Sequence, residues 1–300
     1  MISVKELSKS YGKIKALNKV SLEFSGGVAG LIGPNGAGKT TLIRILVGLA
    51  RQDSGRAYLF GVEAWKDRNI LRKVGVLHEK PRPPSWTSGR RFLEHICRIK
   101  GIDDANSQIE RVSEMLDLRY MDRPISSYSA GMIQRLSAAA CLIGDPELVI
   151  MDEPTANLDP MGRLKLLKVI TNFRKRGTSF FISSHILPEL ERVCDHIFFL
   201  NNGKLVMEGS LDRLRDLGSF ILSFSWEEAP DLLNILKEKF QVEIMDKTVL
   251  IRFKDLNGLM REISEYVLKG GRVPKDLEIR PPTLEELFLI SGGGANDEVA

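Results

Sequence analysis

The segment GPNGAGKT, residues Gly33–Thr40, fits the phosphate-loop pattern G-x4-G-K-[ST]. Its glycines let the backbone wrap around a phosphate, and the start of the helix that follows adds positive potential. Lys39 can reach the β- and γ-phosphates, and the Thr40 hydroxyl can ligate Mg²⁺. A glycine turn with a solvated lysine is the alternative, but the strand-like segment before the motif favours the phosphate loop. The predicted nucleotide-binding residues here are Asn35, Gly36, Ala37, Gly38, Lys39, Thr40 and Thr41.

Two carboxylates follow an apolar segment that the pattern predicts to be a buried strand. Asp152 and Glu153 come directly after Leu148–Met151, and ligands of parallel sheets bind beyond the ends of such strands. One carboxylate there can hold Mg²⁺ through water, while its neighbour can orient or deprotonate an attacking water. An acidic loop without chemistry is the alternative, and it is weakened because the same chain carries a phosphate loop.

A second stretch, SSYSAGMIQRLS at Ser126–Ser137, places a hydroxyl and a glycine where a helix is expected to begin. The first turn of a helix has amides without intrahelical partners and a positive potential, so it is a plausible seat for an anion. The chain therefore contains two potential phosphate seats, and the residue pattern by itself does not explain the second.

The elements that must position these residues alternate between strands and helices. Apolar runs predict strands at 28–32, 56–60, 148–151, 178–183, 197–200 and 205–208. Helical spacing predicts a helix after the phosphate loop, mostly helical structure over 83–145, and a helix over about 160–175. Fully apolar strands alternating with helices indicate a parallel sheet covered on both faces. Asn201-Asn202-Gly203 predicts a hairpin between the last two strands.

A second, smaller domain is predicted after a polar segment at about 209–218. Its predicted elements are a strand (220–226), a helix (230–240), two strands (241–245 and 248–253) turned by Asp246-Lys247, a helix (255–268) and a strand (272–280). This βαββαβ order is typical of ferredoxin-like domains. Pro281–Phe288 is predicted to begin a short helix with Thr283 as N-cap. We therefore expect domains at 1–213 and 219–290, with a disordered tail at 291–300.

Over about residues 1 to 210 the sequence resembles the nucleotide-binding subunit of ATP-binding cassette (ABC) transporters. The family's motifs occur in the family's order: Tyr11, the phosphate loop, Glu79, Ser129–Gly131, Asp152–Glu153, Ala156–Asp159 and Ser183–His185. The resemblance implies an α/β cassette fold with a parallel-sheet core, an antiparallel β part and a helical subdomain at about 83–145, followed by the small C-terminal α+β domain. It also implies an ATPase, which binds ATP and Mg²⁺ and hydrolyses ATP to ADP and phosphate.

The resemblance gives the motif residues specific roles. Tyr11 would stack on adenine, because its ring offers a flat apolar face. Asp152 would be the metal carboxylate, and Glu153 would be the general base. His185 would contact the γ-phosphate and the catalytic water, and Asp159 would lie at a dimer contact and help to position the opposite site.

The resemblance also explains the second phosphate seat. Where the family usually has Leu-Ser-Gly-Gly-Gln, this chain has Tyr128-Ser-Ala-Gly-Met132. Ser129 and the amide of Gly131 would face the ATP of a second copy, so two copies would close head-to-tail on two ATP molecules. Ala130 replaces a glycine, which is tolerable if the φ angle there is negative.

Two further positions concern the metal and a membrane partner. Glu79 stands where the family usually has glutamine, and as a hard oxygen ligand it is expected to join Thr40 and Asp152 in holding Mg²⁺. Lys80–Pro84 lies where the family has a loop that transmits motion to the membrane subunit. A stiff surface connector is the alternative for this proline-rich segment.

The second domain and the ending PPTLEELFLI resemble the C-terminal extension of ABC-2-type export ATPases. The predicted function is therefore an ATPase subunit, as a homodimer, that powers a separately encoded polytopic permease in export, with import left open. One alternative is a soluble ABC ATPase that acts on a ribosome or a nucleic-acid machine. Another is a nucleotide sensor without turnover, against which the presence of Glu153 and His185 argues.

Composition narrows the classes further. The chain has 300 residues, a net charge of +4 and 43% hydrophobic residues, which is typical of globular proteins, and no block of like charges that would indicate a nucleic-acid partner. Cys97, Cys141 and Cys194 are widely spaced, so buried reduced thiols are expected rather than a metal site. Without a signal peptide or a run of about 18 apolar residues, we expect a cytoplasmic protein. The family resemblance implies that it is peripheral on the cytoplasmic face of the cell membrane.

Overall fold

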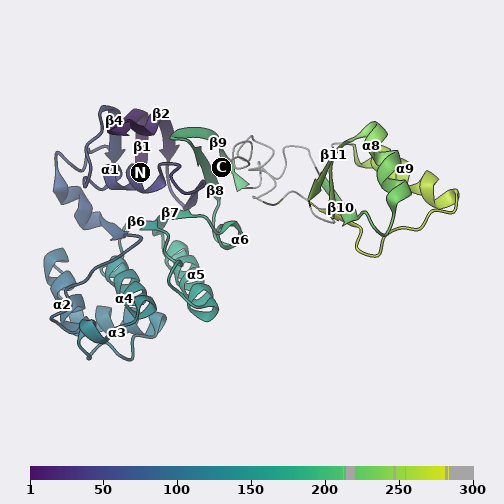
Figure 1. The fold of residues 1–300 in the computed structure, drawn as a ribbon. Helices are drawn as coiled ribbons and strands as arrows, with labels where there is room; N and C mark the ends of the chain where they lie inside the picture. The colour runs from purple at the N-terminus through teal and green to yellow at the C-terminus, as the bar shows by residue number, and fades with distance from the viewer. Residues whose placement is uncertain (212, 214–219, 246–247, 254, 281–282, 284–300) are drawn as a thin grey trace. The chain divides into compact units, whose positions relative to one another are not determined.

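The computed structural model describes residues 1–211, 213, 220–245, 248–253, 255–280 and 283. The chain divides into two compact units, Met1–Ser210 and Leu211–Ala300, whose elements are labelled in Figure 1. Each unit buries a hydrophobic cluster of its own. Among the described residues, no helix has both the length and the apolar character needed to cross a bilayer.

A mixed sheet forms the centre of the first unit, and all of its strands lie in the fully described part of the chain. Its order is β5 (Val74–Leu77), β6 (Leu148–Asp152), β7 (Ser179–Ser184), β3 (Val28–Ile32), β8 (His196–Asn201) and β9 (Lys204–Ser210). All neighbours are parallel except β8 and β9, which form an antiparallel hairpin. Asn202 and Gly203 both have positive φ there, as a two-residue hairpin turn requires. The Asn-Gly turn predicted from the sequence is confirmed.

The central sheet is covered on both faces, as the apolar strands predict. Every residue of β3, β6 and β7 is buried. On β6, Leu148 and Ile150 join the cluster that contains the first helix, α1 (Lys39–Leu46), while Val149 and Met151 point to the opposite face and are equally buried. The helix α5 (Pro160–Lys175) contacts β7.

A second, antiparallel sheet packs over α1. Its order is β2 (Ile14–Phe24), β1 (Ile2–Tyr11) and β4 (Ser54–Leu59). The family resemblance implies this part of the fold, but the residue pattern alone did not assign β1 and β2. Their pairing has several register shifts, and β1 and the first half of β2 lack the regular period of two that would reveal a strand. Only the short stretch Val20–Phe24 of β2 alternates regularly between buried and exposed positions.

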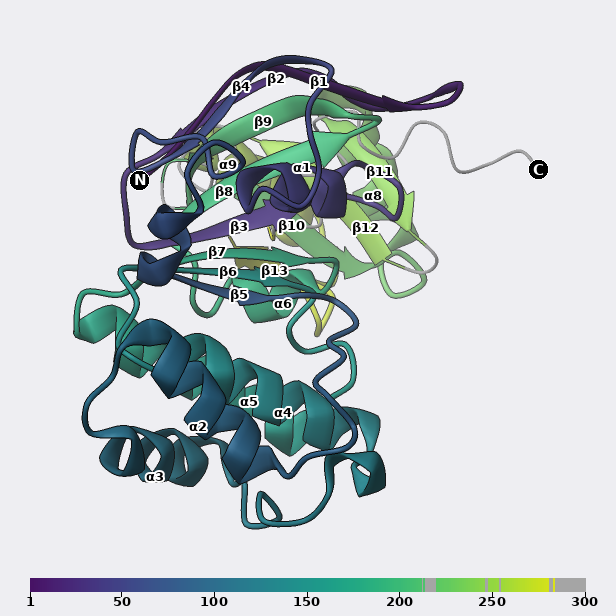
Figure 2. The same ribbon diagram turned by 90° about the vertical axis from the view of Figure 1, so that its left-hand side faces the viewer.

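Most of the remaining helices of the first unit gather away from the antiparallel sheet, as Figures 1 and 2 both show. They are α2 (Gly89–Lys100), α3 (Ala105–Leu116) and α4 (Ala130–Leu142), with a short 3-10 turn at Ile125–Ser127 before α4. A second 3-10 segment, Arg68–Lys73, packs against the core around α1 through Ile70 and Leu71. The side chains of Ser88, Asp104 and Ser129 accept hydrogen bonds from backbone amides and cap the starts of α2, α3 and α4. The predicted helical segment at 83–145 agrees with these bounds. The three cysteines are buried and free, as predicted.

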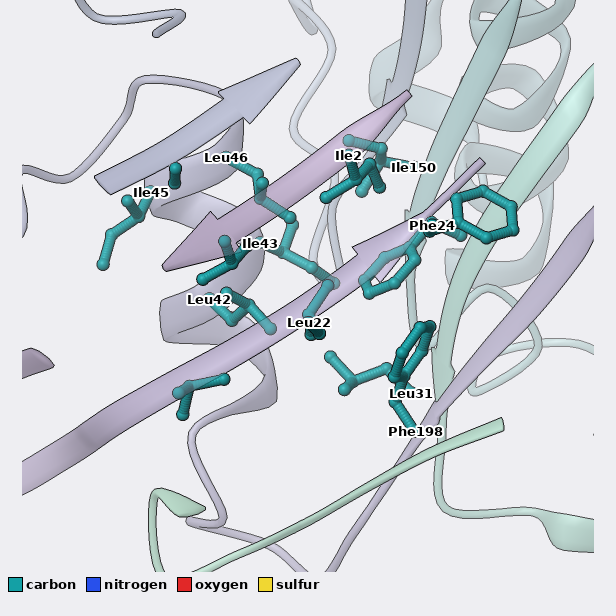
Figure 3. Close-up of a cluster of buried hydrophobic side chains, with 14 of the residues drawn as sticks. Ile2, Leu22, Phe24, Leu31, Leu42, Ile43, Ile45, Leu46, Ile150 and Phe198 are labelled. Carbon is teal, nitrogen blue, oxygen red and sulfur yellow. The ribbon is translucent and has the colours of Figure 1, made fainter. Parts of the chain in front are cut away.

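The core around α1 fixes the loop that precedes this helix. Figure 3 shows Leu42 and Ile43 of α1 among Leu22, Leu31 and Phe198 from three different strands. All five side chains are at most 3% exposed. Because β3 and α1 are both held by this cluster, the six residues between them have little freedom to move.

The second unit contains the βαββαβ order expected from the sequence. Its elements are β10 (Phe220–Ser225), α8 (Pro230–Lys239), β11 (Gln241–Met245), β12 (Thr248–Phe253), α9 (Leu256–Leu268) and β13 (Glu278–Arg280). In the described part of this unit the strands lie in the order β11-β12-β10-β13, with every neighbouring pair antiparallel. This is the arrangement of a ferredoxin-like sheet.

The last strand is shorter than predicted. The sequence pattern predicts a strand over 272–280, but β13 covers only Glu278–Arg280. Pro274 has no backbone amide to donate and also restricts the residue before it, so the segment cannot pair until beyond the proline. The predicted turn at Asp246-Lys247, most of the predicted helix after Pro281 and the predicted tail at 291–300 lie outside the described residues.

Candidate functional site

A cavity of about 490 Å³ opens beside the phosphate loop. Its lining residues are Ile14, Ala16, Pro34, Asn35, Gly36, Ala37, Gly38, Lys39, Thr40, Thr41, Glu79, Glu153, Ala156 and His185. All seven predicted loop residues line it, and so do the predicted base, the predicted histidine and Glu79. Segments that are more than 140 residues apart in the sequence therefore meet at one edge of the central sheet, where β3, β6 and β7 end.

The loop conformation depends on glycine at Gly38. This residue has φ of 105° and directly precedes α1. A Cβ atom here would lie 2.3 Å from the backbone oxygen of Ala16, so a larger residue would meet fixed backbone as well as an unfavourable φ. The backbone turn at Gly38 places the amides of the first turn of α1 at the cavity, where they can bind an anion.

Lys39 is held inside the loop by backbone oxygens. Its Nζ donates to the oxygen of Gly33 at 2.6 Å and to that of Pro34 at 3.2 Å, and it lies 3.8 Å from Oε1 of Glu153. Burial lowers the pKa of Lys39, because an ammonium group loses hydration there, while Glu153 and Asp152 oppose this effect. The Nζ of Lys39 therefore lies on carbonyl oxygens that a phosphate can replace.

Glu153 and His185 form a direct pair. Nδ1 of His185 lies 2.8 Å from Oε2 of Glu153, and the side chain of Glu153 is 11% exposed while that of His185 is 53% exposed. Glu153 follows β6 and His185 follows β7, so the adjacent parallel strands place both residues at the same edge. A carboxylate paired with an imidazole in this position can accept a proton from water and pass it on.

The residues predicted to hold the metal divide into two groups. Thr40 and Glu79 line the cavity. Asp152 is 1% exposed and accepts a hydrogen bond from the hydroxyl of Ser183, so it lies beneath the cavity wall. Within the described residues, no three His, Cys, Asp or Glu side chains converge to hold a metal ion.

The charges of the site fit a divalent cation that arrives with a phosphate ligand. Three carboxylates, those of Asp152, Glu153 and Glu79, act on the ammonium group of Lys39. Their combined charge exceeds that of one lysine and would repel a polyphosphate. Mg²⁺ prefers hard oxygen ligands and is commonly held by one or two carboxylates together with phosphate oxygens, which matches this donor set.

The remaining predicted residues lie elsewhere. Tyr11 stands at the turn between β1 and β2, where its ring is 47% exposed and lies under the ammonium group of Lys9, and it does not line the cavity. Ile14 and Ala16 line it instead, although sequence reasoning missed both because the pattern did not reveal β2. Asp159 caps the start of α5 by accepting from the amide of Gly162 at 3.3 Å.

Ser129 and Gly131 also lie outside this cavity. The exposed Ser129 caps α4, and its hydroxyl accepts from the amide of Met132 at 3.2 Å. Ala130 is the first residue of α4 and does not have a positive φ, so alanine is unstrained there. Gly131 is the restricted position, because a Cβ atom there would lie 2.9 Å from the backbone oxygen of Asn157.

Comparison with known proteins agrees with this geometry. The family model described as ABC transporter matches residues 17–156. An ABC transporter ATP-binding protein, all4389 of Nostoc sp., is 41% identical over 214 residues, which cover 69% of this chain and 63% of that relative. The bacitracin transport ATP-binding protein BcrA of Bacillus licheniformis is 32% identical over 301 residues, 98% of each chain. This chain belongs to the ABC transporter ATP-binding proteins.

Solved structures show the same fold. The structure of an ATP-binding subunit of an ABC transporter superposes with a TM-score of 0.66 and 27% identity, and the match covers 72% of this chain and 92% of that one. As an ABC ATP-binding protein, the chain binds ATP and hydrolyses it. The cavity beside Gly33–Thr41 brings together Lys39, Thr40, Glu79, Glu153 and His185.

Proposed function

We propose that this ABC ATP-binding protein is the ATP-hydrolysing subunit of an exporter whose membrane-spanning permease is a separate chain. The observation that carries the proposal is the similarity to a bacitracin transport ATP-binding protein along 98% of both chains. The similarity includes the second, ferredoxin-like unit, and so extends beyond the cassette that all members of the family share.

The residues that line the cavity can each take a separate role in ATP hydrolysis. Lys39 and the first amides of α1 bind the β- and γ-phosphates, with Lys39 exchanging the carbonyl oxygens of Gly33 and Pro34 for phosphate oxygens. Glu153 accepts a proton from the attacking water, and His185 orients Glu153 and the γ-phosphate. Mg²⁺, held by Thr40, Asp152 and Glu79, would neutralise charge on the phosphates when bound.

The position of the second phosphate seat supports a homodimer. Ser129 is exposed at the start of a 13-residue helix, yet it does not line the cavity of its own chain. A helix start of this kind favours an anion. We infer that Ser129 and Gly131 contact the ATP bound by a second copy, with Asp159 at the contact and Tyr11 on the adenine ring.

A groove beside the proline-rich loop supports the permease contact. It has a volume of about 340 Å³ and is lined by Pro81, Pro83 and Pro84 on one side and by Phe92 and Ile96 of α2 on the other. Trp86, which is 85% exposed, follows the same loop. Exposed apolar patches and tryptophan side chains are typical of protein–protein interfaces. We therefore propose that this groove binds the cytoplasmic side of the permease.

Site-directed cross-linking tests this assignment. The native cysteines are buried, so a new surface cysteine reacts selectively. We expect Pro84→Cys to cross-link to a polytopic membrane protein in native membranes. Arg119→Cys, on a side chain that is 91% exposed and outside the groove, is the matched control and should not. Cross-linking of Pro84→Cys to ribosomal proteins instead would support a soluble translation or nucleic-acid machine.

A further inference from the structure

The two segments that carry Glu153 and His185 meet a second time outside the nucleotide cavity. The hydroxyl of Thr155 donates to Oε2 of Glu189 at 2.6 Å. Thr155 lies two residues after Glu153, and Glu189 lies four residues after His185 in the short helix α6 (Leu187–Leu190). Neither Thr155 nor Glu189 lines the cavity, so this contact does not touch the nucleotide directly.

Glu189 uses both of its carboxylate oxygens. Its Oε1 accepts from Nη1 of Arg163 at 3.3 Å, and Nε of Arg163 donates to the backbone oxygen of Leu158 at 3.0 Å. The side chain of Glu189 is 14% exposed and Thr155 is 2% exposed, so water competes weakly for these hydrogen bonds. One carboxylate thus links α6 to Thr155 directly and to Leu158 through Arg163.

The backbone that Glu189 holds is strained. Glu153 has φ of 48°, a left-handed conformation that a residue with a side chain rarely adopts. Such a conformation persists only when the surrounding structure enforces it. The backbone amide of Glu153 donates to the backbone oxygen of Ser183 at 3.1 Å and lies 3.2 Å from its hydroxyl oxygen. Beyond it, Nε2 of the fully buried Gln134 donates to the oxygen of Pro154 at 2.9 Å, and Thr155 donates to Glu189.

We propose that Glu189 is a positioning residue for hydrolysis, which holds residues 153–158 against α6 so that Glu153 stays in contact with His185. The two contacts, 2.6 Å between Thr155 and Glu189 and 2.8 Å between Glu153 and His185, join the same two segments. Loss of the first contact removes one of the restraints on the second, the others being the bonds of Glu153 to Ser183 and of Gln134 to Pro154. The inference rests on the proposed roles of Glu153 and His185.

The test measures ATP affinity and turnover separately in the full chain. Thr155→Val keeps the shape of the side chain but removes the donor, and Glu189→Ala removes the acceptor. For both we expect kcat to fall about 10- to 100-fold, as small misplacements of catalytic groups do. The ATP Kd should stay within about twofold, because the phosphate loop is untouched. Thr155→Ser should restore kcat, since its hydroxyl can still donate.

Matched controls separate positioning from general damage. Glu114→Gln removes an exposed carboxylate on α3, and Thr171→Val removes a hydroxyl that donates within α5. Both should keep the kcat of the parent chain. Combining Thr155→Val with Glu189→Ala should cost no more than Glu189→Ala alone, because Glu189→Ala already removes the bond to Thr155 together with the contact to Arg163.

The outcomes are distinguishable. A kcat of Glu189→Ala and Thr155→Val within about twofold of the parent overturns the inference while leaving the role of Glu153 intact. A parallel loss of ATP affinity and kcat in Thr155→Val, with no rescue by Thr155→Ser, also overturns it, because the bond would then be merely structural. Full turnover in Glu153→Gln overturns the proposed base, and the inference with it.

Discussion

Lys39 and Glu153 are both charged side chains with little exposure, and each is adjusted to a reaction rather than to stability. Lys39 donates a hydrogen bond to a backbone oxygen that a phosphate oxygen can replace, and burial lowers the pKa of Lys39 below its ordinary value of 10.5. Glu153 sits on a strained backbone with its carboxylate between Lys39 and His185. Strain and unbalanced charge of this kind are typical of functional sites.

The lowered pKa of Lys39 predicts how ATP affinity depends on pH. A bound phosphate favours the ammonium form, so the pKa of Lys39 rises on binding. Affinity should therefore be constant where Lys39 is protonated in both states, and should fall with rising pH through an alkaline window that begins below 10.5. Calorimetric titration with ATP at constant ionic strength measures this fall.

Two substitutions check that Lys39 causes this dependence. Lys39→Gln should lose most of the affinity together with the alkaline fall, whereas Lys168→Gln, at an exposed lysine of α5, should keep both. An unchanged ATP affinity in Lys39→Gln would mean that Gly33–Thr41 is not the phosphate site.

Replacing the proposed base gives a second prediction at this scale. Glu153→Gln keeps the size of the side chain but cannot accept the proton of the attacking water, so kcat should fall about 100-fold or more. ATP binding should persist, and the bound ATP should trap the dimer, which size-exclusion chromatography with light scattering detects. Glu147→Gln, at an exposed residue before β6, is the control and should hydrolyse normally. A monomer at high protein concentration with ATP would contradict head-to-tail closure.

At the scale of elements, the start of α4 contains two neighbouring small residues that should differ in how well they tolerate substitution. Ala130 has helical backbone and is exposed, so Ala130→Gly should cost at most about 1 kcal/mol. Gly131→Ala would place a methyl group 2.9 Å from the backbone oxygen of Asn157, and overpacking of this kind costs about 1–3 kcal/mol.

The comparison of these two variants is therefore the prediction for this element. We expect Gly131→Ala to lower the melting temperature more than Ala130→Gly and to reduce ATP hydrolysis, because it moves either α4 or the segment that follows Glu153. Thermal unfolding and steady-state ATPase assays measure both effects. Equal melting temperatures and equal ATPase rates for the two variants would show that the segment at Asn157 can move aside without loss of stability.

For the whole molecule, the two separate cores predict separable unfolding. Leu236 is fully buried in the cluster of the second unit, and its replacement by alanine should cost about 2–5 kcal/mol there. ATP stabilises only the unit that binds it. In calorimetry, Leu236→Ala should lower the melting temperature of the second unit. The rise in the melting temperature of the first unit on adding ATP should stay unchanged.

A matched change in the first unit completes this prediction. Leu42→Ala removes a buried side chain of α1 beside the phosphate loop, so it should lower the other transition and weaken the effect of ATP. Loss of the ATP-dependent shift in Leu236→Ala would show that the two units unfold as one.

How much the sequence predicts depends on the distance between the residues involved. The phosphate loop, the parallel strands, the Asn202-Gly203 turn and the order of elements in the second unit are local patterns, and the structure agrees with them. Ile14 and Ala16 were missed because they lie in the first half of β2, where buried and exposed positions do not alternate regularly. The roles of His185, Asp159 and Ser129 came only from resemblance to a family, since each depends on a partner that is distant in the sequence.

The sequence by itself determined the chemistry of the loop, because six consecutive residues between a strand and a helix already define a phosphate cradle. Only the tertiary structure decided which carboxylate meets His185, that Lys39 turns onto the oxygen of Gly33, and that Thr155 meets Glu189. The contacts of Glu153 with His185 and of Thr155 with Glu189 exist because the neighbouring parallel strands β6 and β7 end at one edge, whereas the contact of Lys39 with Gly33 forms within the loop itself. Strand order is a property of the packed sheet and is not encoded in the pattern of any one segment.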